Sequence, residues 1–201
     1  DLGTLTYVNK NNQLFLLFAQ KLYQADIETG TSQVLEEGIK QNHFVVSDTK
    51  AHAAWLIESG DDAGKIREIE FDSLKTRDIS PESGKNLRAL GFMNEDLVYG
   101  ILSDEDILTD ANGHETEGLS TFRIESFKGK VKKEYHQDGL YVTNVTVGST
   151  MMEFELSAKS GNAYTVQKKD NIMNNKKASG SQIDVALITT NRAGTLIRLT
   201  M

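Results

Sequence analysis

The 201-residue sequence has no cysteine, and this absence excludes several kinds of site and scaffold. Without thiols the chain cannot form a disulfide framework, a thiolate nucleophile or a cysteine-ligated zinc site. Proline is almost as rare, with a single residue in the whole chain. Since a proline removes a hydrogen bond from a strand ladder, this scarcity suits closely paired strands.

The sequence also lacks long apolar runs and has few basic residues, and both features limit the classes of protein to which it can belong. No apolar run reaches the roughly 18–20 residues that cross a bilayer as a helix, and no signal-peptide pattern opens the chain. Basic residues are outnumbered, with 22 Lys and Arg against 29 Asp and Glu and a net charge of −7. No basic cluster is dense enough to neutralise a row of phosphates, so we expect no nucleic-acid partner. Because the sequence begins with Asp1 rather than Met, we expect a processed product or an excised segment.

The sequence contains short runs of apolar residues and no long segment with the spacing of an amphipathic helix. The segments Leu14–Phe18, Ala53–Ile57 and Leu97–Leu102 are nearly continuous apolar runs, which are typical of strands buried on both faces. Alternating segments such as Tyr23–Ile27 and Phe122–Glu125 lie between them and are typical of strands with one covered face. The sequence therefore predicts an all-β protein.

An apolar run followed by alternating segments recurs along the chain. We expect repeat units at residues 5–36, 43–80, 87–136 and 141–170, followed by a polar connection over residues 171–180 and a terminal hairpin at 183–200. Four strands in about 40–45 residues is the period of a β-propeller blade. The sequence thus predicts a single propeller-like domain over residues 1–201, an array of about four to five four-stranded antiparallel blades.

The array has two ways to protect its ends. Either terminal strands complete a shared sheet and close a small ring, or the chain is an arc of a larger ring. An arc exposes sheet edges, so we expect it to be covered by a neighbouring domain or a second copy. The sequence predicts neither the number of blades nor the oligomeric state.

Two segments resemble the repeats of TolB-like and WD40-like β-propellers. Residues Tyr23–Gly30 are similar to the Y-x-x-D-x-x-T-G hairpin between the third and fourth strands of such repeats. Residues Val46–Trp55 are similar to their S-P-D-G-K-x-I-A hairpin, although the Pro is missing and Thr49 stands at the Gly position. The resemblance covers about residues 5 to 170 and implies a propeller fold without implying an activity.

A looser resemblance concerns location. The stretch from Leu97–Gly100 through Tyr141–Thr143 resembles uncharacterised, membrane-anchored extracytoplasmic proteins of Gram-positive bacteria. This resemblance implies a cell-surface protein, anchored through a part of the polypeptide outside this sequence. It brings no catalytic residues.

An acidic insertion, Ser103–Gly118, separates the second and third strands of its unit. Loops in this position share one propeller face with the connections between blades, and loops on a rigid scaffold often carry function. Three interpretations stay open for it: a solvated acidic loop, a weak cation site and a partner-binding loop. The candidate binding residues are Asp104, Glu105, Asp106, Asp110, Asn112 and Glu115.

No catalytic constellation is visible. The four His residues lie in unrelated segments, and His52, at the start of a strand, is interpreted as a turn or edge residue. We therefore expect no catalytic residues, no metal site and no cofactor, and we interpret the chain as a non-enzymatic extracytoplasmic interaction module of a larger surface protein. Its partner would be another protein or another domain of the same polypeptide. The alternative is a hydrolase acting on a glycan or a peptide, which needs a carboxylate pair converging in a pocket on the loop face.

Overall fold

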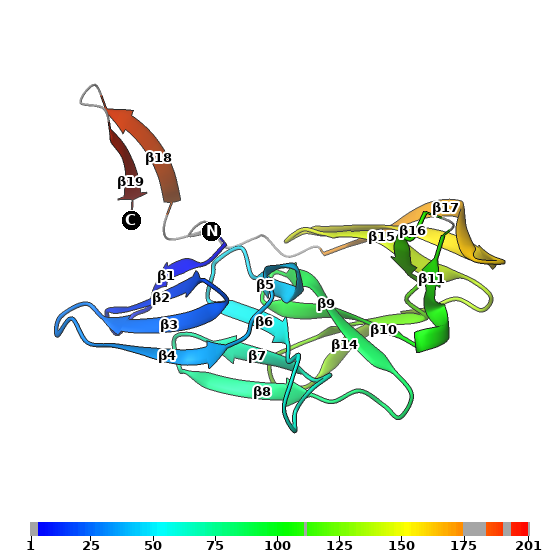
Figure 1. Cartoon of the computed structure of the whole chain (residues 1–201), viewed down its shortest axis with the longest axis horizontal. Coiled ribbons are helices and arrows are strands. Elements are labelled where there is room, and N and C mark those ends of the chain that lie inside the picture. Colours follow the sequence, from blue (N-terminus) through cyan, green and yellow to red (C-terminus); the bar gives the residue numbers. More distant parts are fainter. Residues whose placement is uncertain (1–3, 111, 175–183, 191–193, 201) are drawn as a thin grey trace.

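The computed structural model describes residues 4–110, 112–174, 184–190 and 194–200, and its regular structure is almost entirely β (Figure 1). Each of its first three sheets has four antiparallel strands that lie side by side in chain order. The first sheet consists of β1 (Thr6–Val8), β2 (Gln13–Phe18), β3 (Lys21–Asp26) and β4 (Ser32–Glu37). The second consists of β5 (Phe44–Val46), β6 (His52–Leu56), β7 (Ile66–Glu70) and β8 (Lys75–Ile79). The third consists of β9 (Asn86–Met93), β10 (Asp96–Leu102), β13 (Thr121–Glu125) and β14 (Val131–His136).

The rest of the chain forms smaller sheets. The fourth sheet has three strands, β15 (Tyr141–Val147), β16 (Met151–Ser160) and β17 (Ala163–Met173). The acidic insertion contributes a 3-10 turn at Asp104–Asp106 and a hairpin of β11 (Ile107–Thr109) and β12 (Glu115–Glu117). A terminal hairpin pairs β18 (Asp184–Thr190) with β19 (Gly194–Thr200). The other helix in the described residues is a 3-10 turn at Gln41–His43, and neither turn is long or apolar enough to span a membrane.

The fold class predicted from the sequence is confirmed, because the chain is all-β and its repeating element is a four-stranded antiparallel sheet. The last strand of the fourth unit runs slightly past the predicted end at about residue 170, because β17 continues to Met173 into the predicted polar connection. Residues 175–183 and 191–193 of the predicted connection and hairpin lie outside the described part of the chain. That residues 1–201 form one domain stays a prediction.

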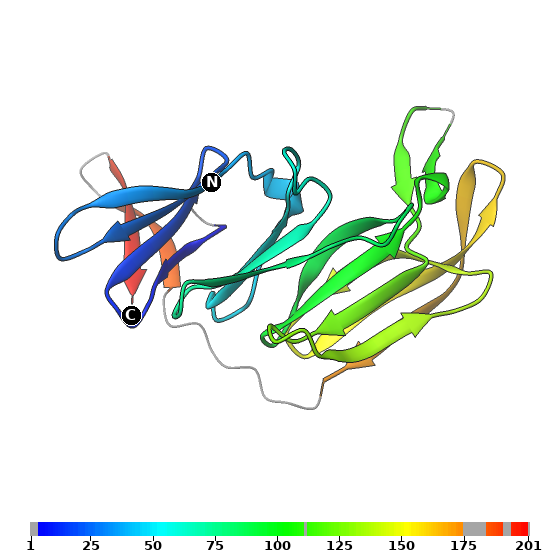
Figure 2. The same ribbon diagram turned by 90° about the horizontal axis from the view of Figure 1, so that it is seen from below.

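Neighbouring sheets stand face to face, and each interface contains one apolar cluster (Figure 2). Strand alternation divides the side chains of a shared strand between two clusters. On β6, Ala53 and Trp55 pack against the first sheet while Ala54 packs against the third. On β10, Tyr99 faces the second sheet while Val98 faces the fourth. The second and third sheets are therefore buried on both faces.

Aromatic rings fill the interface between the third and fourth sheets. Phe122 and Tyr135 stack with their ring centroids 5.0 Å apart, and Phe154 of the fourth sheet lies edge-on to both, at 5.3 and 5.1 Å. Within the described residues no apolar cluster joins the first sheet to the fourth, so these residues form an open array rather than a closed ring. Each terminal sheet consequently has one face that none of the other three large sheets covers, and we call this its uncovered face.

The Phe154→Ala variant tests this face-to-face packing. Phe154 is buried among the rings between the third and fourth sheets, so its removal leaves a cavity and should lower the free energy of unfolding by about 3–5 kcal/mol. Chemical denaturation followed by tryptophan fluorescence measures the change. Val166→Ala, at an exposed position of the same sheet, serves as the control and should shift stability by less than about 0.5 kcal/mol. Equal losses in the two variants would contradict the packing.

Candidate functional site

Three acidic residues at the start of the insertion form hydrogen bonds or ion pairs with their own turn and with the neighbouring sheets. Asp106 is buried, and its carboxylate accepts a hydrogen bond from the backbone N–H of Ser103 (3.3 Å) and lies 3.6 Å from Lys159 Nζ. Asp104 accepts a hydrogen bond from Asn86 Nδ2, and the carbonyl oxygen of Glu105 accepts one from Lys159. These three predicted site residues therefore attach the insertion to the third and fourth sheets.

At the tip of the insertion, Asp110 shapes the turn. Its carboxylate accepts hydrogen bonds from the backbone N–H groups of His114 (2.9 Å) and Asn112 (2.8 Å), and these bonds lower the pKa of Asp110. Residue 111 lies outside the described part of the chain. Within residues that are described, no group of three or more His, Asp and Glu is arranged to hold a metal ion. That these loop residues bind a ligand stays a prediction.

The base of the insertion borders a cleft between the second and third sheets. The cleft has a volume of about 460 Å³, and its lining residues are Asn42, His43, Leu56, Arg88, Ala89, Leu90, Glu115 and Glu117. Of the predicted site residues, it contains only Glu115. Glu117, two residues along β12, binds the Arg88 guanidinium through both carboxylate oxygens at 2.5–2.8 Å. The hydrolase alternative needs a free carboxylate pair here, and the Arg88 contact does not favour it.

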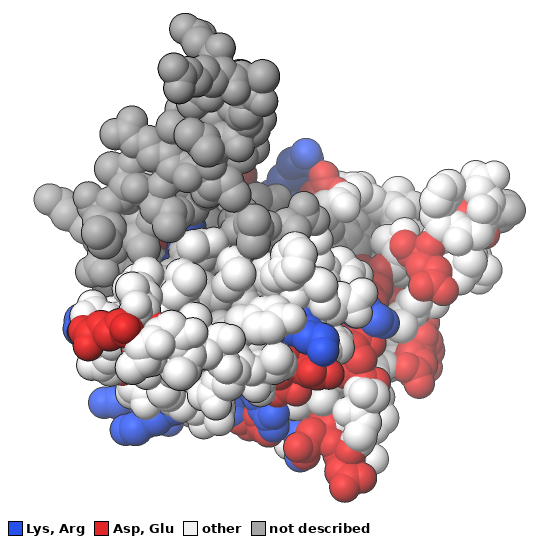
Figure 3. Space-filling model, turned by 60° about the vertical axis from the view of Figure 1, so that its left-hand side comes forward, with Lys and Arg blue, Asp and Glu red and all other residues white. Residues whose placement is uncertain are grey.

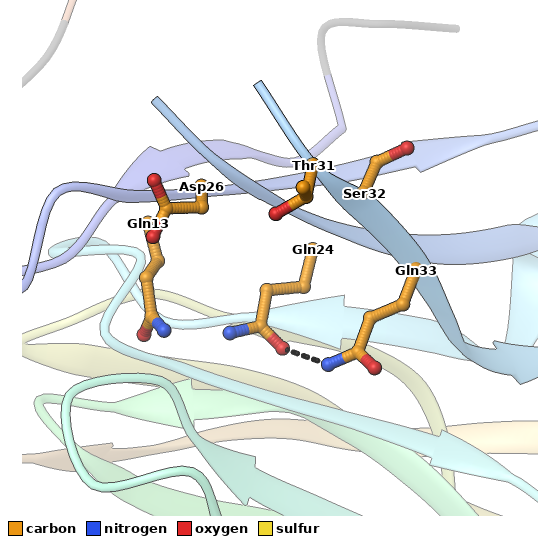
Figure 4. Close-up of a pocket in the computed structure, with 6 residues that line it drawn as sticks. All are labelled: Gln13, Gln24, Asp26, Thr31, Ser32 and Gln33. Carbon is orange, nitrogen blue, oxygen red and sulfur yellow. Dashed lines mark hydrogen bonds between the residues drawn. The ribbon is translucent and has the colours of Figure 1, made fainter. Parts of the chain in front are cut away.

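A second concavity lies on the first sheet and has an almost wholly polar lining (Figure 4). Its volume is about 330 Å³, and side chains of β2, β3, β4 and the adjoining turn line it: Gln13, Gln24, Asp26, Thr31, Ser32 and Gln33. Gln33 donates to Gln24 across 2.8 Å. The Asp26 carboxylate accepts the backbone N–H of Thr29, which lowers its pKa, so it stabilises the hairpin turn. No sequence pattern marks this pocket, because its residues belong to the ordinary polar alternation of the strands.

A buried charge cluster lies between the second and third sheets. Glu68 is fully buried and accepts a hydrogen bond from Arg77 Nε at 2.7 Å. The same guanidinium contacts Glu125 of β13, whose other oxygen accepts a hydrogen bond from Tyr99 at 2.7 Å. Burial and the hydrogen bond to Glu125 raise the pKa of Tyr99 to about 12. The cluster therefore connects the two sheets through charges rather than apolar contacts.

His52 lies beside this cluster, and its interpretation as a turn or edge residue was wrong in one respect, because its side chain is buried. Its Nδ1 is 3.6 Å from Glu68, and its Nε2 is 3.9 Å from Glu70 and 3.8 Å from Glu95. Burial lowers the pKa of His52, but the nearby carboxylates of Glu68, Glu95 and Glu70 raise it by a larger amount, so the net pKa is raised. Compared with the unfolded chain, the folded protein therefore favours the imidazolium form of His52.

The uncovered face of the first sheet is apolar. Phe15 and Leu17 of β2 pack against the second sheet, so the alternate residues Leu14, Leu16 and Phe18 lie on the opposite face. Their register partners on β3 are Ala25, Tyr23 and Lys21, and Tyr23 pairs in turn with Val34 of β4. Phe18 is 50% exposed and Val34 is 40% exposed. Figure 3 brings this side forward and shows a largely uncharged surface with Lys, Arg, Asp and Glu toward its borders.

The sequence matches no protein-family model and no curated protein sequence. Solved structures that it resembles include TolB from Acinetobacter baumannii, with 14% identity and a TM-score of 0.43 over 94% of this chain and 48% of TolB. The WD40 repeats of RRP9 match at 11% identity and a TM-score of 0.40 over 81% of this chain and 51% of theirs. Oligogalacturonate lyase from Vibrio parahaemolyticus matches at 12% identity and a TM-score of 0.42, over 81% and 50%. The chain spans about half the length of these proteins.

The pH dependence of stability tests the charge cluster. Since the pKa of His52 is raised above its ordinary 6.5, its contribution to stability is complete below pH 6.5 and is lost as the pH rises through the folded-state pKa. Urea denaturation from about pH 5.5 to 8.5 should therefore show a loss of wild-type stability that is smaller in His52→Gln, which retains only the contribution of the other histidines. His114→Gln, at an exposed position, should keep the wild-type profile. Parallel profiles for wild type and His52→Gln would refute the assignment.

Proposed function

We propose that this chain is a protein-interaction module that binds its partner through the uncovered apolar face of the first sheet. One observation carries the proposal. The run Leu14–Phe18 is apolar at every position, which is typical of a strand covered on both sides, yet the second sheet covers only the face that holds Phe15 and Leu17. A sheet face of this composition gains free energy when another surface removes it from water.

The partner is a sheet face of another protein or of another domain of the same polypeptide. Each inner interface of the array pairs two such faces, as where Trp55 and Phe71 of the second sheet meet Phe15 of the first. At the border of the uncovered face, the Lys21–Glu37 ion pair, 2.8 Å long, supplies a polar rim. An apolar centre with a charged rim is the usual anatomy of a protein interface.

The proposal includes a location outside the cytoplasm, as part of a larger surface protein. It is supported by the resemblance of the stretch from Leu97–Gly100 through Tyr141–Thr143 to membrane-anchored extracytoplasmic proteins of Gram-positive bacteria. Protease treatment of intact cells that express the native gene tests it, because a surface protein is cleaved while a cytoplasmic marker survives. Survival of the protein until the cells are lysed would contradict the location.

Photo-crosslinking tests the binding face. A benzophenone amino acid at Phe18 should form a defined product whose crosslinks, located by mass spectrometry, fall on alternate residues of a partner β-strand. Val34→Arg on the same face should reduce the yield at least about tenfold, because it places a charge in the apolar centre. Val166→Arg, an exposed position of the fourth sheet, is the matched control and should leave the yield unchanged. A yield that does not respond to Val34→Arg would refute the proposal.

A further inference from the structure

Within the described residues the fourth sheet has three strands, whereas each of the first three sheets has a fourth, outer strand. β17 is its third strand, and it pairs with β16 in antiparallel register from Ala163 to Met173. Among the described residues no strand pairs with the other edge of β17. Most of its side chains are exposed, although Tyr164 near its start contacts the acidic insertion. An accessible edge of this kind can accept a further strand through backbone hydrogen bonds.

In the three complete sheets, a cross-strand ion pair joins the third strand to the fourth. Each pair places a cation of the third strand directly opposite a carboxylate of the fourth, and the pairs are Lys21–Glu37, Arg67–Asp78 and Arg123–Glu134. The charged atoms lie 2.5–2.8 Å apart. Opposite charges in this register stabilise strand pairing and select the strand that pairs.

The cation also has the same kind of neighbour on the second strand of each complete sheet. On its other side it lies opposite an apolar residue of the second strand, and these residues are Phe18, Trp55 and Tyr99 for the three complete sheets. In the second and third sheets this residue points toward the preceding sheet of the array. On the third strand of a further sheet, a cation opposite such an apolar residue is therefore the position at which a cross-strand carboxylate is expected.

Lys168 occupies this position in the fourth sheet. It lies opposite Leu156 of β16, and Leu156 packs against the preceding, third sheet. Its side chain is 49% exposed, and the acid that it approaches is Asp170 of the same strand, 3.8 Å away. Lys168 thus has the place of Lys21, Arg67 and Arg123 without their cross-strand carboxylate.

From this repeated pattern we infer that the edge of β17 binds an acidic β-strand of another polypeptide, which places an Asp or Glu opposite Lys168 and completes the fourth sheet. The continuing chain does not supply that acid, since the sequence contains no Asp or Glu between Asp170 and Asp184. Asp184 itself begins β18, which pairs with β19. A second copy of β17 is a less favourable occupant than an acidic strand, because it brings Lys168 and Lys169 with only one acid, Asp170, and so repeats the net positive charge of this edge.

A labelled peptide tests the inference. The probe copies residues 30–38, which include β4 with Glu36 and Glu37, and the control peptide carries Glu36→Lys and Glu37→Lys. Fluorescence anisotropy with the full chain should show saturable binding of the acidic peptide and much weaker binding of the lysine peptide. Hydrogen exchange should show new protection confined to amides of β17. Equal binding of both peptides, or protection elsewhere, would overturn the inference.

Reversing the charge of Lys168 distinguishes a specific ion pair with the peptide from general electrostatic attraction between peptide and protein. Lys168→Glu should weaken binding of the acidic peptide about five- to tenfold and should strengthen binding of the lysine peptide. Lys75→Glu changes an exposed lysine on β8, the outer strand of a complete sheet, and should leave both affinities unchanged. Circular dichroism and the melting temperature establish that both variants fold. An equal effect of the two substitutions, or concentration-dependent self-association that protects β17 without peptide, would refute the assignment.

Discussion

The structure depends on one constraint: a four-stranded sheet with apolar side chains on both faces is stable only between two other surfaces. The second and third sheets meet this constraint within the chain, because Ala53 and Ala54, adjacent on β6, enter different apolar clusters. The terminal sheets meet it on one side only. Stability in such an array is therefore shared between neighbours rather than held by one central core.

Much of this fold could be predicted from the sequence, because strand alternation is a local property. The apolar runs at Ala53–Ile57 and Leu97–Leu102 predicted strands buried on both faces, and the structure covers both. The end of β17 could not be predicted in this way. Residues from Lys168 to Asn171 are polar on both faces, so no alternation marks the strand, and only Ile172 is buried beyond them.

The candidate sites depend on contacts between sheets, and these are harder to predict. The charge cluster combines Glu68 of β7, Arg77 of β8 and Glu125 of β13, and no spacing in the sequence relates the third member to the others. A local signal did exist at Glu68, a carboxylate between Ile66 and Ile69 in a strand that must be buried. The acidic insertion is easy to recognise in the sequence by its charge. In the structure, however, several of its acids, such as Asp106, hold the loop in place.

The charge cluster also makes the three interfaces of the array unequal. Between the third and fourth sheets, Phe122, Tyr135 and Phe154 form ring contacts that involve no ionised group. Between the second and third, Arg77 holds carboxylates from both sheets, and separating them would leave ionised groups without partners in a poorly hydrated space. That interface therefore resists small sliding movements, and it fixes the relative orientation of the two halves of the array.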